Sequence, residues 1–212
     1  MSLSSKTRFP WATFSLATII AIVSIVAFDD LDNAIDHFGL IPDQVWRYGG
    51  LTLFTSFFIH VKVTHLIYNL YLLILLGMPL ENHLGWKRWL LLVFIAAFSG
   101  DLLHVFIFPH DQVSCVGASG GISGLIAFYA LKSPYARLRI LFTDFSFLKR
   151  LQIPAWLVFM LWMLLQFWGL YKQSTGPYHV VVSAHLGGIA AGVLLWMMWN
   201  KLNLSQPQTL QH

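Results

Sequence analysis

The chain has 212 residues, of which 57% are hydrophobic and only 10% are charged. An average soluble domain carries about 25% charged residues, so this composition excludes an ordinary soluble enzyme, a disordered chain and a nucleic-acid-binding arm. The nine tryptophans and seven tyrosines are typical of a protein with two lipid–water interfaces, where amphipathic rings gather. The single Cys115 cannot form an internal disulfide. The composition therefore predicts an integral membrane protein that crosses the bilayer several times.

A helix needs about 20 apolar residues to cross the hydrocarbon layer. Six apolar segments, of which the fourth is short, are expected to do so: Phe9–Phe28, Val63–Leu80, Trp89–Phe108, Gly117–Leu131, Ile153–Tyr171 and Val180–Asn200. They predict an all-α membrane protein in which residues 9–200 form a single six-transmembrane-helix bundle. Residues 1–8 and 201–212 are then short cytoplasmic tails. The first segment lacks a small-residue cleavage site, so we expect an uncleaved anchor.

The basic residues predict the orientation of this bundle. With six spans and both termini in the cytoplasm, ten lysine and arginine residues face inward and three face outward, as the positive-inside rule requires. A further apolar segment, Tyr48–Val61, has only 14 residues, and counting it as a seventh span would leave four inside and nine outside. We therefore expect it to be an interfacial or re-entrant element in a first outer loop, residues 29–62, that folds on the membrane.

Ser119 is a candidate nucleophile. It lies in Gly117-Ala118-Ser119-Gly120, at the start of the short fourth span, and about 20 Å of helix separate it from Lys132. The fourth helix is therefore expected to begin inside the membrane, where its free N–H groups and its positive end can stabilise an oxyanion. The alternative is a small residue that permits close helix packing.

His185 is the candidate base, in the sixth span. Gly188 and Gly192 form a GxxxG pair on an adjoining face, which lets another helix approach closely. The fourth span carries a matching row of small residues: Ser119, Ser123, Ala127 and Ala130. Packing of these two faces would bring His185 to the serine, where a neutral imidazole can take the serine proton. A purely structural hydrogen bond is the alternative.

Two other polar pairs lie at helical spacing at membrane depth, where polar groups usually mark function. His65 and Asn69 occupy one face of the second span and can both donate to an oxyanion; alternatively they tie down the first outer loop. Asp101 and His104, in the third span, are expected to form a local ion pair. Carboxylates are too few at this depth for a metal site, so no metal is expected.

Two residues are assigned to loops. Glu81 follows Pro79 and is predicted to anchor the turn of an inner loop after the second span. His60 is predicted to belong to the first outer loop.

The motifs resemble those of the rhomboid family of intramembrane serine proteases. The similarity runs from Trp46 to about Leu195, and its parts occur in the family's order: Trp46-Arg47, His65-xxx-Asn69, Glu81-xxx-Leu84-Gly85, Gly117-Ala118-Ser119-Gly120 and Ala184-His185-xx-Gly188-xxx-Gly192. A GxSG motif alone is not specific, whereas its combination with HxxxN and AHxxGxxxG is.

The resemblance implies a site and a mode of action. Ser119 would be the nucleophile and His185 the base of a dyad without a third acid residue. His65, Asn69 and the backbone N–H of Ser119 would form the oxyanion hole. Trp46-Arg47 would belong to the membrane-lying first loop, and the fifth span, which is rich in aromatic side chains, would move as a substrate gate.

The sequence departs from the family pattern at Ser123. Many members carry an aromatic ring there that supports the histidine, so His185 is expected to be held differently or more loosely. Gly121-Ile122-Ser123-Gly124 is also a second GxSG, one turn deeper. Ser119 is preferred because Gly117–Leu125 matches the family's GASGxxxGL pattern and lies at the helix start.

We therefore expect an intramembrane serine endopeptidase that acts in the lipid bilayer on single-span or polytopic membrane proteins, without a cofactor or nucleic acid. One alternative is a catalytically inactive rhomboid-like binding or quality-control protein, although such proteins would be expected to lose the serine or the histidine. Another is a small-solute or proton transporter using Asp101, His104 and His185, which would more often show repeated halves. A compact core without extra domains or a transit peptide favours a bacterial inner membrane.

Overall fold

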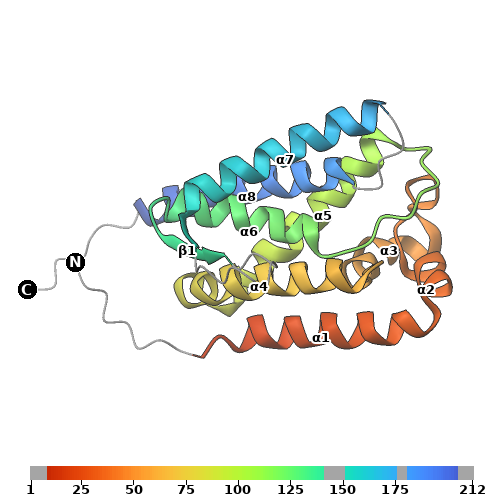
Figure 1. Cartoon of the computed structure of the whole chain (residues 1–212), viewed down its shortest axis with the longest axis horizontal. Coiled ribbons are helices and arrows are strands. Elements are labelled where there is room, and N and C mark those ends of the chain that lie inside the picture. The colour runs from red at the N-terminus through yellow and green to blue at the C-terminus, as the bar shows by residue number, and fades with distance from the viewer. Residues whose placement is uncertain (1–8, 141–150, 176–180, 205–212) are drawn as a thin grey trace, which may run out of the picture.

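The computed structural model describes residues 9–140, 151–175 and 181–204. Six helices form a bundle that α5 crosses obliquely (Figure 1): α1 (Trp11–Ala27), α4 (Val63–Leu84), α5 (Trp86–Ile107), α6 (Ser119–Lys132), α7 (Ala155–Thr175) and α8 (Val182–Leu204). The predicted all-α membrane bundle is confirmed. Of the expected tails, residues 1–8 and 205–212 lie outside the described residues.

The number of spans is supported in part. Among the described residues, five segments are long and apolar enough to cross a membrane: Trp11–Phe38, Val63–Leu84, Trp86–Ile107, Ala155–Lys172 and Val182–Leu202. Helix α6 has only 14 residues, fewer than the about 20 that a crossing needs, so a sixth span stays a prediction. It packs against α4, α5, α7 and α8, so protein surrounds it in place of lipid. The start of α1 and the end of α8 lie at the same end of the bundle (Figure 1).

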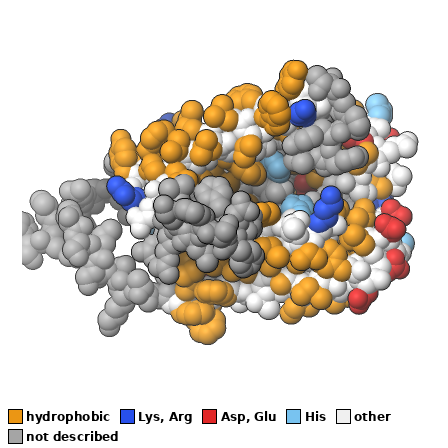
Figure 2. All heavy atoms as spheres, in the orientation of Figure 1, with side chains coloured by type: hydrophobic (Ala, Val, Ile, Leu, Met, Phe, Trp, Pro, Cys, Tyr) orange, Lys and Arg blue, Asp and Glu red, His pale blue; other side chains and the backbone are white. Residues whose placement is uncertain are grey.

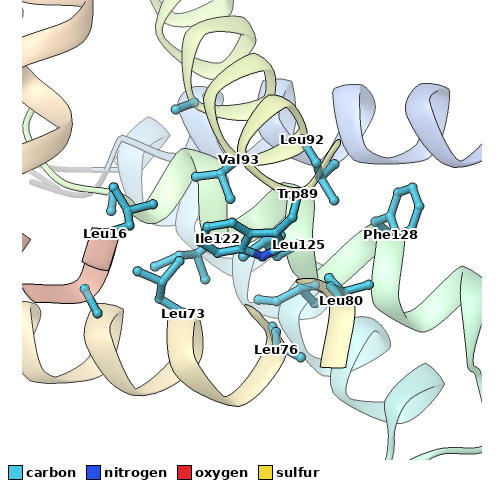
Figure 3. Packing of buried hydrophobic residues seen from close by; sticks show 14 of the residues in the cluster. Leu16, Leu73, Leu76, Leu80, Trp89, Leu92, Val93, Ile122, Leu125 and Phe128 are labelled. Atoms are coloured by element: carbon cyan, nitrogen blue, oxygen red, sulfur yellow. The ribbon is translucent and has the colours of Figure 1, made fainter. Parts of the chain in front are cut away.

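The apolar core lies between α4, α5 and α6. Trp89 is fully buried at its centre, with Leu73, Leu76, Ile122 and Leu125 around it (Figure 3). On the face shown in Figure 2, apolar side chains are spread along the length of the bundle, whereas acidic ones gather at the end that carries α2 (Leu31–Phe38). This distribution suits a bundle with lipid around its middle and water at its ends.

Helices α6 and α8 pack with their backbones in contact. A Cβ atom added at Gly188 would lie 2.0 Å from the carbonyl oxygen of Gly120, and one added at Gly192 would lie 2.4 Å from that of Gly124. Helix α8 therefore packs on the row of α6 that contains Gly120 and Gly124. The predicted row, Ser119, Ser123, Ala127 and Ala130, lies one residue away. Glycine is required at the contact because any side chain would keep the two backbones apart.

The end of α4 corrects another prediction. The helix continues through Pro79, so Glu81 lies within it and not in a loop. The Glu81 carboxylate accepts hydrogen bonds from the backbone N–H groups of Ala12 (3.1 Å) and Thr13 (2.7 Å) and from the Thr13 hydroxyl (2.7 Å). These groups belong to the first turn of α1, where Pro10 supplies no side-chain cap. Glu81 therefore caps α1 from a neighbouring helix and holds the two helices together.

The first outer loop folds into short helices, which the sequence did not specify. Besides α2 and α3 (Thr52–Thr55), it contains the single turns Phe28–Asp30, Pro42–Gln44, Arg47–Gly50 and Ser56–Phe58. The Arg47 guanidinium donates to the backbone carbonyls of Asp36 and Gly39. Leu40 forms an antiparallel bridge with Cys115. The loop is thereby tied to the segment that leads into α6.

A pair of short strands precedes α7 and was not predicted. Strands β1 (Arg137–Ile140) and β2 (Leu151–Pro154) are antiparallel, with Leu138 opposite Ile153 and both side chains buried. The expected fifth span therefore begins at Ala155, two residues later than predicted.

The glycine contact predicts an asymmetric response to substitution. Gly188→Ala should lower the free energy of unfolding by about 3 kcal/mol, because the added methyl group collides with backbone that cannot move aside. Gly120→Ala is the matched control, since the nearest atom to its added Cβ is 3.5 Å away. It should change stability by less than about 0.5 kcal/mol. Denaturant unfolding in detergent micelles measures both, and equal losses would contradict the packing described above.

His60 predicts a dependence of stability on pH. It lies in the first outer loop, as predicted, and is fully buried with Nδ1 3.0 Å from the Ser24 hydroxyl. Burial, with a smaller contribution from His65, lowers the pKa of His60 from 6.5 to about 3. The unfolded chain therefore binds a proton at a pH where the folded chain does not, and stability falls as pH drops below 6.5.

The measurement is the free energy of unfolding between pH 7 and pH 5. His60→Asn, which keeps a hydrogen-bonding group beside Ser24, should reduce the loss over this interval by about 2 kcal/mol relative to the wild type. His110→Asn, at an exposed loop position, should leave the loss as it is. The same loss in His60→Asn and wild type would show that His60 is not buried in its neutral form.

Candidate active site

The contact between α6 and α8 brings Ser119 and His185 together. Ser119 is the first residue of α6, and His185 lies in the first turn of α8. The Oγ atom of Ser119 lies 2.8 Å from Nε2 of His185. The histidine is buried and the serine half-buried. Two residues separated by 66 positions in the sequence are therefore within hydrogen-bond distance, as their motifs predicted.

A sharp turn delivers Ser119 to the start of its helix. Gly117 has a φ of +120°, which favours glycine, and a Cβ atom there would lie 2.7 Å from Cε1 of His65. The N–H of Gly117 donates to the carbonyl of Ser56 in the first outer loop, at 2.9 Å. The N–H groups of the first turn of α6, including that of Ser119, need partners outside the helix.

Two residues of α7 surround the His185 ring. The Nδ1 atom of His185 lies 2.7 Å from Oε1 of Gln166, and Nε2 of Gln166 donates to the carbonyl of Trp162 at 3.1 Å. The centroid of the Trp162 ring lies 5.4 Å from that of the imidazole. Gln166 is not among the functional residues expected from the sequence, and the one signal for it was an isolated amide in an apolar span.

Ser123 occupies the position where the family pattern has an aromatic ring. Its hydroxyl donates to the carbonyl of Ser119 at 2.7 Å and accepts from Nε1 of Trp162 at 3.2 Å. Trp162 therefore supplies, from α7, an aromatic ring beside His185. The structure therefore supports a His185 that is held differently from the family pattern and not one that is held more loosely.

A cavity of about 970 Å³ opens beside the nucleophile candidate. Ser119, His185, His65 and Asn69 all line it, so the structure gathers every predicted site residue around one space. The side-chain amide of Asn69 donates to the carbonyl of His65 at 2.9 Å, and an asparagine amide has a second N–H for another acceptor.

The predicted ion pair between Asp101 and His104 is wrong. The Asp101 carboxylate accepts from the Ser56 hydroxyl at 3.4 Å, whereas Nδ1 of His104 lies 2.9 Å from Oγ of Ser183. The two side chains face different neighbours, the first outer loop and α8. Each side chain has a hydroxyl partner of its own, and an ion pair between them would require desolvating two charges for one contact. Within residues 9–140, 151–175 and 181–204, no three histidine, cysteine or acidic residues are grouped to hold a metal ion.

The geometry provides the parts that acyl transfer requires. A serine hydroxyl lies beside an imidazole nitrogen, the arrangement by which an adjacent base activates a nucleophile. Donors that could hold an oxyanion are available at the start of α6 and on the side chains of His65 and Asn69. The cavity gives a substrate and water a place to enter.

Comparisons with known proteins match this architecture. The family model of the Rhomboid domain matches residues 42–201. RHOMBOID-like protein 1 of Arabidopsis thaliana is 33% identical over 72% of this chain and 34% of its own length. Rhomboid-like protease 3 of Toxoplasma gondii is 30% identical over 74% of this chain and 53% of its own length. Inactive rhomboid-related protein 2 of Caenorhabditis elegans is 29% identical over 71% of this chain and 39% of its own length.

The similarity to these relatives shows the family of this chain but not its activity or its membrane. The chain spans about a third to a half of their length. All three come from eukaryotes, so they lend no support to the expected bacterial inner membrane. One is named a protease and another is named inactive. The family model nevertheless covers most of the chain, including every predicted site residue, and this chain belongs to the rhomboid family.

Proposed function

We propose that the chain is an intramembrane serine endopeptidase that cleaves transmembrane proteins through a Ser119–His185 dyad. The 2.8 Å contact between the serine oxygen and the imidazole carries this proposal. Family membership alone does not decide activity, because an inactive relative is among the matches. Retention of both residues at bonding distance favours the protease over an inactive binding protein.

The proposed reaction begins when Oγ of Ser119 attacks a peptide carbonyl while Nε2 of His185 takes the serine proton. The oxyanion accepts hydrogen bonds from the Ser119 backbone N–H and from His65 and Asn69. The protonated histidine then donates to the leaving amine, and an acyl ester remains on Ser119. Water, deprotonated by His185, attacks the ester and releases the second product with the serine restored.

The membrane imposes conditions on the substrate. A helical segment must unwind locally, because its carbonyls are engaged in i to i−4 hydrogen bonds. Water must reach Ser119 through the cavity, since lipid cannot solvate the polar groups that line it. We place the start of α1 and the end of α8 in the cytoplasm, because most lysine and arginine residues then lie inside. The site then serves substrates near the outer leaflet.

Covalent labelling with a fluorophosphonate tests the assignment of the nucleophile. The wild-type chain in proteoliposomes should be labelled once, Ser119→Ala should not be labelled, and His185→Ala should be labelled about 10² to 10⁴ times more slowly. Gel fluorescence and peptide mass spectrometry measure the rate and the position.

Ser123→Ala is the matched control, because it removes the serine of the second GxSG one turn deeper. It should still be labelled at Ser119. Labelling that survives in Ser119→Ala and disappears in Ser123→Ala would move the nucleophile to Ser123. A wild-type chain that is not labelled in detergent or in lipid would favour the inactive binding protein.

A further inference from the structure

Gln166 is an unusual residue for its position in the bundle. Among the α7 side chains that the structure describes, it is the only buried polar one, with 3% of its surface exposed. Its neighbours Leu165 and Phe167 are exposed and apolar. A buried amide is destabilising unless its donors and acceptor are paired, so its two hydrogen bonds account for its presence there.

These hydrogen bonds fix the direction of the amide. The Nε2 group of Gln166 lies 3.1 Å from the carbonyl of Trp162, and a carbonyl only accepts. The opposite orientation would place two oxygens against each other. Oε1 therefore faces His185, 2.7 Å from its Nδ1 atom.

The direction of the amide determines the tautomer of the imidazole. Because Oε1 of Gln166 only accepts, Nδ1 of His185 must carry the hydrogen. In a neutral imidazole Nε2 then holds the lone pair, and this is the atom 2.8 Å from Oγ of Ser119. The hydroxyl consequently donates to the nitrogen that would remove its proton. The other tautomer would set a lone pair against Oε1 and an N–H against the serine.

We propose that Gln166 is a positioning residue for His185, holding the imidazole in the orientation and tautomer that can accept the Ser119 proton. This inference rests on the proposed protease function. When the imidazolium forms, its Nδ1–H donates to Oε1 in a charge-assisted hydrogen bond, which stabilises the charged state. A neutral amide does so without a second charge in a site where a buried carboxylate would require its own compensation.

Placement on α7 makes this support conditional. Ser119 and His185 belong to α6 and α8, which pack closely, whereas Gln166 comes from a third helix. Only 17% of the most apolar stretch of α7 is buried, against 33% to 56% in the other four long segments. Displacement of α7 would therefore separate the imidazole from its partner while leaving Ser119 and His185 side by side.

The kinetic test measures fluorophosphonate labelling of the full chain in proteoliposomes as a function of probe concentration and pH. Gln166→Ala should lower the maximal rate of labelling by about 10- to 100-fold with the half-saturating probe concentration unchanged. Gln166→Glu should restore part of the rate, because it keeps an acceptor for Nδ1 of His185 but loses the donor to the Trp162 carbonyl. In Gln166→Glu, the acidic limb of the curve of labelling rate against pH should move to higher pH, because a carboxylate favours the imidazolium. Leu165→Ala, at the exposed neighbour on α7, should match the wild type.

A spectroscopic readout separates this inference from the proposed function. In ¹⁵N spectra of the histidine-labelled chain, with His185 assigned by its loss in His185→Asn, Nδ1 should be the protonated nitrogen. In Gln166→Ala the two tautomers should interconvert. A wild type that does not react with the fluorophosphonate but gives the expected ¹⁵N spectrum would refute the proposed protease function and keep the positioning role. Wild-type kinetics in Gln166→Ala, or a His185 protonated on Nε2, would overturn the positioning role.

Discussion

The site depends on one interaction, the backbone contact between α6 and α8. Gly188 and Gly192 meet Gly120 and Gly124 without any side chain between them. This close approach places the first residue of one helix beside the first turn of the other. A methyl group added at Gly188 or Gly192 would collide with the α6 backbone and force the two helices apart. The glycines of the two motifs therefore serve the geometry of the neighbouring serine and histidine.

A second constraint comes from the surroundings of that pair. Polar groups at membrane depth must find partners within the protein, and here the partners form a connected set. Ser119 is hydrogen-bonded to His185, and His185 is hydrogen-bonded to Gln166. Hydrogen bonds of Ser123 with Ser119 and with Trp162 connect the same turn of α6 to α7. Three helices thus contribute to the orientation of one imidazole. The departure from the family's aromatic position is compensated by a ring that arrives from another helix.

Much of this arrangement could be predicted because it depends on local properties of the sequence. Apolar length located the helices to within a few residues, and polar residues inside apolar segments identified Ser119, His185, His65 and Asn69. The row of α6 that meets α8 could not be predicted, because several rows of small residues lie on that short helix. The rotation of α5 about its own axis, which the sequence does not specify, directs Asp101 and His104 to different neighbours.

Other features depend on contacts between distant segments, which sequence patterns do not show. In the sequence, Glu81 resembles a loop residue because it follows a proline. Its role as a cap appears only in the fold, where it contacts Thr13 of α1, 68 positions earlier in the chain. Gln166 is one amide in an apolar helix, and it acquires a role only when α7 is turned toward His185. Strands β1 and β2 are four residues long, too short for their alternation to stand out beside the following helix.

The most direct measurement is an experimental structure of the chain after reaction with a fluorophosphonate. We expect phosphorus bonded to Oγ of Ser119, with the phosphonyl oxygen facing the Ser119 backbone N–H and the side chains of His65 and Asn69. An adduct on Ser123, or a phosphonyl oxygen that faces away from all three donors, would contradict this expectation.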